Sequence, residues 1–191
     1  MEDPVIVLDE VAVITTMGAE SRRGERESLA DALRPFREII RMQDPARLEG
    51  GDVMRIDQRL YVGLSHRTDR AGAEQLSLLL APFGYEVIAV PLHNCLHLKS
   101  GCTHLGEGRI LINPEWVDPS VLGEYTFIEV ASDEPAAANA VRVRETVLLP
   151  SAYPKTAQIL RSNGFKVREL EVSELLKAES GVTCSSLIFE A

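Results

Sequence analysis

The sequence feature that most constrains this chain is a loose internal repeat with a period of roughly 40–50 residues. One copy has an apolar strand-like run, a helical stretch over 68–82 and a β-rich run after Gly84. A later copy has the same order, with a helical stretch over 153–161 and a β-rich run after Gly164. Because a glycine after the last helical turn suits the left-handed C-terminal position, each copy predicts a helix followed by a returning strand.

Two weaker copies fill the remaining sequence, and each predicts a strand, a helix and a second strand. The expected elements are the strand 11–15, the helix 25–33 and the strand 38–42, then the strand 109–112, a short helix over 114–122 and the strand 126–130. A further strand precedes each hairpin, as residues 53–56 do, and a last strand near 186–189 closes a unit. The repeating unit is therefore strand–strand–helix–strand.

This repeating unit leaves a sheet face that it cannot bury alone, so neighbouring units must pack side by side. The pattern predicts an α/β fold with a radial or stacked array of units, and ligand sites in such rings often lie at the centre. A single doubly wound sheet is the competing interpretation. A length of 191 residues, with 45% hydrophobic and 26% charged, fits a single domain over residues 1–191 and excludes disorder for most of the chain.

Charge and cysteine content exclude several classes of protein. The formal net charge of −9 argues against binding to nucleic acid or to an anionic membrane, and is compatible with a small cationic substrate. No apolar run approaches the ~20 residues that a membrane span needs. Three cysteines cannot all pair, which favours free thiols and a cytoplasmic location. The chain has no glycine-rich phosphate loop, so we expect no nucleotide cofactor.

Cys184 and His97 are the first candidates for chemistry. Cys184 lies among small and hydroxylated residues after Gly181, which is typical of a turn into a strand with an accessible thiol. A free cysteine is nevertheless more often a small buried hydrophobe. Alternation places His97 and Lys99 on one face of a strand. A histidine beside a thiol makes a nucleophile–base pair, whereas a lone histidine is more often structural.

A zinc site is a weaker interpretation of the same region. His93, Cys95 and His97 alternate along the sequence, so they can share one face of a strand, and Cys102 follows shortly after. The chain has neither a Cys-x-x-Cys pair nor a His-Glu-x-x-His helix, the two spacings that most often mark zinc. The spacing therefore ranks zinc well below nucleophilic catalysis.

Charged residues beside turns supply the remaining candidates. The segment Glu49-Gly50-Gly51-Asp52 is either a plain loop before a strand or a turn that delivers a carboxylate to a site. Glu2 and Asp3 precede an apolar strand, where a solvated chain end is the ordinary expectation. Arg22 and Arg67 lie in corresponding loops of successive repeats, and two such arginines can grip a carboxylate, although surface loops explain them equally well.

Taken together, these motifs resemble the dimethylarginine dimethylaminohydrolase family of the guanidino-group-modifying amidinotransferase superfamily. The matching motifs occur in family order along the whole chain. They are Glu2-Asp3, Ser21-Arg22-Arg23-Gly24-Glu25, Leu48-Glu49-Gly50-Gly51-Asp52, Ser65-His66-Arg67-Thr68, Leu96-His97-Leu98-Lys99-Ser100 and Gly181-Val182-Thr183-Cys184-Ser185-Ser186-Leu187. Each motif is weak singly, and jointly they are specific. The resemblance implies a five-bladed α/β propeller of strand–strand–helix–strand blades around a central site, of which this chain holds about four.

The resemblance also implies a role for each matching residue. Cys184 would be the nucleophile that attacks the guanidinium carbon, and His97 the general acid and base. Glu49 would hydrogen-bond the guanidinium and help to orient His97. Asp3 would bind the guanidinium nitrogens, with Glu2 supporting that pocket.

Arg22 and Arg67 would bind the α-carboxylate of the substrate. The implied substrate is a methylated arginine, hydrolysed to citrulline and dimethylamine or methylamine through a covalent S-alkylthiouronium on the cysteine. Dividing the reaction at a covalent intermediate is ordinary nucleophilic catalysis, and it requires no metal and no organic cofactor.

The chain departs from the family pattern at its start. Family enzymes begin about one blade earlier, so we expect this chain to lack the N-terminal blade. A ring of four blades exposes a strand edge, which favours a homodimer. Two alternatives follow: an arginine deiminase-like hydrolase, and a catalytically incompetent propeller that only binds guanidino compounds. The lysine after the histidine motif and the lack of a helical insertion favour the dimethylargininase interpretation over the deiminase.

Overall fold

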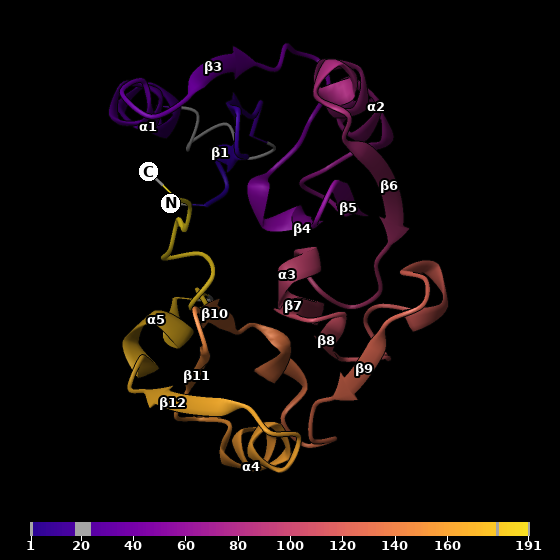
Figure 1. Ribbon diagram of the computed structural model, residues 1–191, viewed down its shortest axis with the longest axis vertical. Helices are drawn as coiled ribbons and strands as arrows, with labels where there is room; N and C mark the ends of the chain where they lie inside the picture. The colour runs from indigo at the N-terminus through magenta and orange to yellow at the C-terminus, as the bar shows by residue number, and fades with distance from the viewer. Residues whose placement is uncertain (1, 18–23, 179, 191) are drawn as a thin grey trace. The chain divides into compact units, whose positions relative to one another are not determined.

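The computed structural model describes residues 2–17, 24–178 and 180–190 (Figure 1). The chain divides into two compact units. Unit 1 consists of Met1–Pro91 together with Ser186–Ala191, and unit 2 consists of Leu92–Ser185. In the described residues, each unit contains two three-stranded sheets.

All four of these sheets follow one plan, in which an antiparallel hairpin is joined by a third strand parallel to its second strand. The strands of unit 1 are β1 (Val5–Val7), β2 (Val11–Ile14), β3 (Glu38–Arg41), β4 (Val53–Ile56), β5 (Arg59–Leu64) and β6 (Glu86–Pro91). Those of unit 2 are β7 (Cys102–Gly106), β8 (Arg109–Ile112), β9 (Thr126–Glu129), β10 (Val141–Val143), β11 (Thr146–Pro150) and β12 (Lys166–Leu170).

Helices supply the crossovers that parallel pairing requires. The helix α1 (Glu25–Leu33) connects β2 to β3, α2 (Arg70–Leu80) connects β5 to β6, and α4 (Pro154–Ser162) connects β11 to β12. Within unit 1 α2 packs against β6, and within unit 2 α4 packs against β12 (Figure 1). The predicted order strand–strand–helix–strand is therefore confirmed for three of the four repeats.

The third repeat differs because its connection contains no α-helix. The helix predicted over 114–122 is wrong: the described chain forms only the 3-10 turn η4 (Pro119–Val121) there. Asp118 accepts a hydrogen bond from the Ser120 N–H at 2.9 Å, which caps this turn, and Gly123 then takes a positive φ of 99°. Proline and glycine this close together leave no room for a run of i to i−4 hydrogen bonds.

The two glycines that mark the stronger repeats adopt the predicted conformation. Gly84 ends the helical segment of the second repeat with a φ of 78°, and Gly164 ends that of the fourth with a φ of 84°. Side chains with a Cβ rarely adopt this left-handed region, so glycine suits both positions. The strands β6 and β12 begin directly afterwards, and this confirms the predicted return strands.

The shorter helical segments lie at turns. They are α3 (Leu98–Gly101), α5 (Ser173–Lys177), η2 (Gly50–Asp52), η3 (Ala81–Phe83) and η5 (Pro135–Ala138). Throughout the described ranges, every helix is too short or too polar to cross a membrane.

Apolar faces of the repeats form separate cores within each unit. In unit 1 one cluster joins Leu48, Leu60 and Leu76, and a second joins Val5, Ile14 and Leu33. In unit 2 the apolar face of α4 packs on the sheet of β10 to β12 and on neighbouring residues such as Leu105 and Leu111. Removing these aliphatic side chains from water stabilises each unit, at about 25 cal/mol per Å² of apolar surface.

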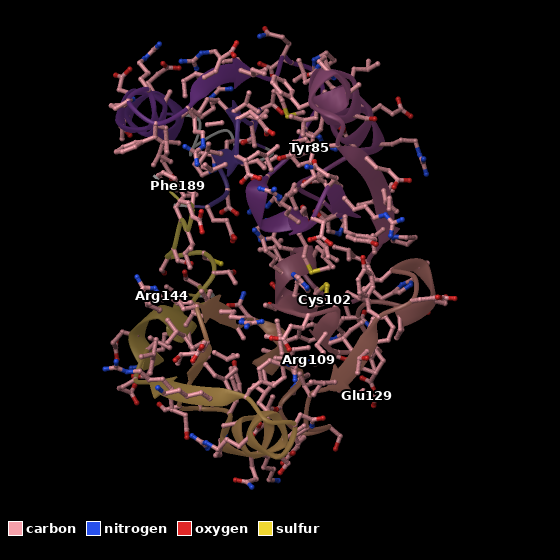
Figure 2. The ribbon with its side chains drawn as sticks, viewed as in Figure 1. Tyr85, Cys102, Arg109, Glu129, Arg144 and Phe189 are labelled. Carbon is pink, nitrogen blue, oxygen red and sulfur yellow. The ribbon has the colours of Figure 1, made fainter. Side chains whose placement is uncertain are left out.

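The last described segment, residues 186–190, does not form the strand predicted near 186–189. Leu187 and Phe189 pack on the second core of unit 1. The Phe189 ring lies 5.8 Å from that of Phe36, edge to face, and the Arg37 guanidinium lies 5.4 Å from its centroid (Figure 2). Arg37 also donates to the Glu190 carbonyl. This segment is therefore held by side-chain contacts and not by the backbone hydrogen bonds of a strand.

Candidate active site

Unit 1 gathers buried carboxylates from two segments distant in sequence. Glu2 and Asp3 precede β1, whereas Glu49 caps the turn η2 before β4 and Asp52 is the last residue of that turn. The exposed fractions are 9% for Glu2, 4% for Asp3, 1% for Glu49 and 0% for Asp52. Carboxylates are rarely buried to this degree unless they have partners. This burial excludes the ordinary interpretation, in which Glu2 and Asp3 form a solvated chain end and residues 49–52 a plain loop.

The main chain fixes the position of Asp3. Its carbonyl accepts from the Gly50 N–H at 2.8 Å and from the Thr15 hydroxyl at 2.8 Å, and its side-chain Oδ1 accepts from the Gly51 N–H at 3.2 Å. A Cβ on Gly50 would lie 2.3 Å from the Glu2 carbonyl oxygen. Glycine is therefore required at position 50 for the two carboxylate segments to come this close.

A second turn secures Glu49 from the other side. The Glu49 N–H donates to the Thr68 hydroxyl at 3.0 Å. The Ser65 hydroxyl donates to Asp52 Oδ2 at 2.7 Å and accepts from the N–H groups of Arg67 and Thr68. The turn 65–68 is thus bonded to both ends of the Glu49–Asp52 segment.

This arrangement places a cation next to the buried carboxylates. Arg67 Nη1 lies 3.7 Å from Glu49 Oε1, with 35% of the arginine side chain exposed and 1% of the glutamate. An accessible guanidinium can take an anionic group, while the carboxylates around Glu49 favour a cationic one. Arg22, the other arginine expected to act here, lies outside the described residues.

Unit 2 contains a cavity of about 380 Å³ that both His97 and Cys184 line. The residues around it are Leu96, His97, Ser100, Ala136, Asn139, Pro150, Tyr153, Leu176, Ser180, Gly181 and Cys184. A thiol and an imidazole on one concave surface are the two groups that nucleophilic catalysis on carbon requires. Cavities of this size accept small-molecule ligands.

His97 does not lie on a strand. The alternation that placed His97 and Lys99 on one strand face is wrong, because residues 98–101 form the helical turn α3. His97 is the N-cap of this turn, with extended backbone angles, and it is only 7% exposed. Short apolar and polar alternation is ambiguous between a strand and a single helical turn, and tertiary packing decides between them.

Cys184 lies in the turn 182–185, as the sequence predicted for this glycine-led segment. Its thiol is half-buried, and its Sγ lies 3.9 Å from the Thr183 hydroxyl oxygen. The Ser185 hydroxyl donates to the Gly181 carbonyl at 3.3 Å, which closes the turn. The thiol is therefore accessible from the cavity and not sealed in the core.

The zinc interpretation fails on geometry. His93, Cys95, His97 and Cys102, all of them described residues, do not form a group with metal-ligand spacing. Cys102 is completely buried in β7, and burial raises the pKa of its thiol far above the ordinary value, with a smaller contribution from Cys95. A thiol with a raised pKa is a poor nucleophile, since attack needs the thiolate.

Sequence reasoning missed Asn139. This residue lines the unit-2 cavity and is 8% exposed, and its side chain bonds to the segments that carry His97 and Cys184. The available signal was weak: a single amide within the run Ala136-Ala137-Ala138-Asn139-Ala140, where every neighbour is small and apolar. A buried side-chain amide needs hydrogen-bond partners, which makes such a residue worth examining.

The chain is similar to several known proteins. The family model described as arginine deiminase matches residues 1–148. The chain is 36% identical over 191 residues to N(G),N(G)-dimethylarginine dimethylaminohydrolase of Pseudomonas aeruginosa, covering 99% of this chain and 75% of that protein. It is 35% identical over 189 residues to the enzyme of the same name from Streptomyces coelicolor, covering 98% of this chain and 72% of the relative.

A solved structure matches with similar coverage. It is the Pseudomonas aeruginosa enzyme, as a cysteine-to-serine mutant complexed with citrulline, with a TM-score of 0.90 and 35% identity. The match covers 96% of this chain and 72% of that one. The repeats described above are therefore units of the α/β-propeller fold, and three of them have the order strand–strand–helix–strand. On sequence and fold together, this chain belongs to the dimethylarginine dimethylaminohydrolase family of the guanidino-group-modifying amidinotransferase superfamily.

Proposed function

We propose that this chain hydrolyses N(G),N(G)-dimethylarginine, or the monomethyl form, to citrulline and dimethylamine or methylamine. One observation carries the proposal: a thiol, Cys184, and an imidazole, His97, line one cavity in a chain 36% identical to a dimethylaminohydrolase along its whole length. The reaction is hydrolysis of a C–N bond in a guanidino group.

Cys184 is the nucleophile in this proposal, and His97 is the general acid and base. The Cys184 thiolate adds to the guanidinium carbon and forms a tetrahedral adduct. His97 gives a proton to the departing nitrogen, so neutral dimethylamine leaves and an S-alkylthiouronium remains on the sulfur. Water, deprotonated with help from His97, then adds to the same carbon. The C–S bond breaks, citrulline leaves, and the thiolate returns.

The carboxylates of unit 1 bind the cationic end of the substrate. Glu49 and Asp3 accept hydrogen bonds from the guanidinium nitrogens and hold the group planar, and Glu49 also helps to orient His97. Glu2 supports that pocket. The support for these roles is the burial of all three side chains and the main-chain bonds that fix two of them. A charged group held in this way is aligned without a further ordering cost.

Arg22 and Arg67 bind the α-carboxylate of the substrate. Arg67 supports this role through its accessible guanidinium beside Glu49. The catalytic unit as one domain over residues 1–191, the homodimer and the cytoplasmic location stay predictions of the sequence. Sedimentation velocity of the purified chain tests the homodimer.

An arginine deiminase activity is the second candidate, because the family model that matches residues 1–148 carries that description. The two activities differ in the group that leaves, which is ammonia from arginine and an alkylamine from methylated arginines. Relative values of kcat/KM for arginine, monomethylarginine and dimethylarginine separate them. A tenfold preference for arginine would overturn the dimethylargininase assignment.

The decisive experiment is citrulline release from asymmetric dimethylarginine by the wild type, Cys184→Ser and Cys95→Ser. Cys95 is the matched control because it is also a half-buried cysteine of unit 2. We expect release by the wild type and Cys95→Ser, and a loss of at least about 10³-fold in Cys184→Ser, since removing a nucleophile disables the whole catalytic group. A folded wild type without release, checked by circular dichroism, would favour a propeller that only binds guanidino compounds.

A further inference from the structure

The side chain of Asn139 bridges the two segments of unit 2 that carry the reactive groups. Its Nδ2 donates to the Lys99 carbonyl at 3.1 Å, and Lys99 lies in α3, two residues after His97. The same Nδ2 donates to the Thr183 hydroxyl at 2.9 Å, and Oδ1 accepts from the Thr183 N–H at 3.2 Å. Thr183 directly precedes Cys184. One amide therefore connects two segments that lie 40 residues before it and 44 residues after it in sequence.

These bonds use both N–H groups and the carbonyl oxygen of the Asn139 side chain in a buried place. The residue is 8% exposed and Thr183 is 5% exposed. In such surroundings a hydrogen bond is electrostatically stronger than in water, and a lost partner leaves a desolvated polar group behind. The bridge is consequently a stiff connection and not an incidental surface contact.

Gly181 fits against this amide. A Cβ at position 181 would lie 2.1 Å from Asn139 Oδ1 and 2.4 Å from its Cγ. Real Cβ atoms do not approach other atoms this closely, so any larger residue at 181 must displace the amide. Glycine is therefore required at position 181, at the start of the turn of Cys184, because a Cβ there would overlap the Asn139 side chain.

We propose that Asn139 is a positioning residue for the hydrolysis, which holds the turn of Cys184 in register with the helical turn of His97. This inference rests on the proposed function and adds a residue to it. Asn139 acts through its bonds to the Lys99 carbonyl on one side and to the Thr183 N–H and hydroxyl on the other. Misplacement of a catalytic group by about 1 Å can cost around 10²-fold in rate, so loss of the bridge should lower kcat and leave substrate binding by unit 1 intact.

Asn139→Ala tests the proposal, and Asn113→Ala is its matched control. Asn113 is a buried amide of the same unit that donates to the Pro135 carbonyl at 3.0 Å and accepts from the Glu115 N–H at 3.0 Å, but it does not line the cavity of Cys184. We expect Asn139→Ala to lower kcat by roughly 10- to 100-fold with KM within about threefold. We expect Asn113→Ala to leave kcat within about twofold, although both variants lose a buried amide.

Gly181→Ala provides an independent route to the same defect. It keeps Asn139 but forces the amide aside, so kcat should fall as in Asn139→Ala. In the double variant the smaller side chain at 139 makes room for the new Cβ, so its kcat should equal that of Asn139→Ala alone. If the two substitutions acted independently, their separate losses in kcat would instead multiply in the double variant. A multiplied loss, or a Gly181→Ala variant with unchanged kcat, would overturn the proposal even if Asn139→Ala fails to fold.

Alkylation of Cys184 by iodoacetamide at neutral pH separates this inference from the proposed function. The assay needs no substrate. Peptide mass spectrometry assigns the modified cysteine. Because the bridge holds the turn of Cys184 in its place on the cavity, we expect the alkylation rate of Asn139→Ala to differ severalfold from that of the wild type, and that of Asn113→Ala to equal it. Equal rates in all three proteins would overturn the positioning role. Absence of citrulline release from the wild type would overturn the proposed function. The alkylation comparison would still test whether Asn139 positions Cys184.

Discussion

The two groups of polar residues in this protein are held in different ways. In unit 1 the carboxylates of Asp3 and Glu49 are fixed by main-chain hydrogen bonds and by the close approach that Gly50 permits. In unit 2 the segments of His97 and Cys184 are connected by a single side-chain amide beside an accessible cavity. The carboxylates of the first group are fixed by the backbone, whereas the thiol of the second group opens onto a cavity.

This difference suits the chemistry proposed for each group. Carboxylates that bind a cation need a fixed geometry and little water, because burial strengthens their field. A nucleophile needs an open approach for the substrate and for the water that follows it. We therefore expect changes in unit 1 to affect mainly substrate binding and stability, and changes around the cavity of unit 2 to affect mainly kcat.

Glu49→Gln should give the largest effect of the following changes. The variant keeps the shape of the side chain and removes its charge, so one charge-assisted hydrogen bond to the guanidinium becomes a neutral one. Because such bonds contribute about 1.5–3 kcal/mol, kcat/KM for dimethylarginine should fall by roughly 10- to 150-fold, through a higher KM and, since Glu49 also orients His97 in the proposal, through a lower kcat. Steady-state kinetics measures both parameters.

Glu38→Gln is the control for this change, since Glu38 is an exposed glutamate of β3 in the same unit. Its kinetics should match the wild type within about twofold, as is usual for surface substitutions. If Glu49→Gln instead lowers kcat with KM unchanged, Glu49 acts on the reacting groups and the contrast between the two units breaks down.

Gly50→Ala should give the next largest effect, on stability. The new Cβ would meet the Glu2 carbonyl oxygen at 2.3 Å, and backbone on both sides leaves little room for adjustment. Overpacking of this kind costs typically 1–3 kcal/mol of the free energy of unfolding, equivalent to several degrees in Tm. Gly24→Ala is the control because nothing lies within 4 Å of a Cβ there. Equal melting temperatures for the two variants would show that the carboxylate segments are not rigidly held.

Cys102 should give the smallest effect, confined to alkaline pH. Burial raises the pKa of its thiol above the ordinary value of 9.0, so the folded protein keeps a proton that the unfolded chain loses above pH 9. The contribution of this thiol to the free energy of unfolding is therefore fully present below pH 9. It decreases as the pH rises above 9, by at most about 1.4 kcal/mol per pH unit. Urea unfolding between pH 8 and 10.5 gives, for the wild type and for Cys102→Ala, the slope of the free energy of unfolding against pH. Equal slopes would show that the buried Cys102 thiol does not cause the loss of stability.

Local patterns predicted most of the repeated fold. The helix expected over 25–33 is α1, and Gly84 and Gly164 take the left-handed conformation expected after their helices. These predictions succeeded because apolar periodicity and a glycine at a helix end are local signals. The helix expected over 114–122 and the strand near 186–189 failed because apolar spacing cannot show whether a hydrogen-bond partner is within reach.

The candidate site divides in the same way. The motifs around Glu49, His97 and Cys184 were weak singly and became specific only through their joint resemblance to a family, and the strand face assigned to His97 was wrong. Asn139 carried almost no local signal, since its partners lie 40 and 44 residues away in sequence. A lone amide among alanines becomes informative only when the structure shows what it bonds to.

The sequence by itself determined the strand–strand–helix–strand repeat and the turns that need glycine, and its resemblance to a family supplied the candidate residues for guanidino chemistry. The tertiary structure decided that Asp3 and Glu49 share one buried cluster, that His97 caps a helical turn, and that His97 and Cys184 line one cavity. The physical reason is that periodicity and backbone preference act over a few residues. Burial and hydrogen bonding between distant segments exist only once the chain has folded.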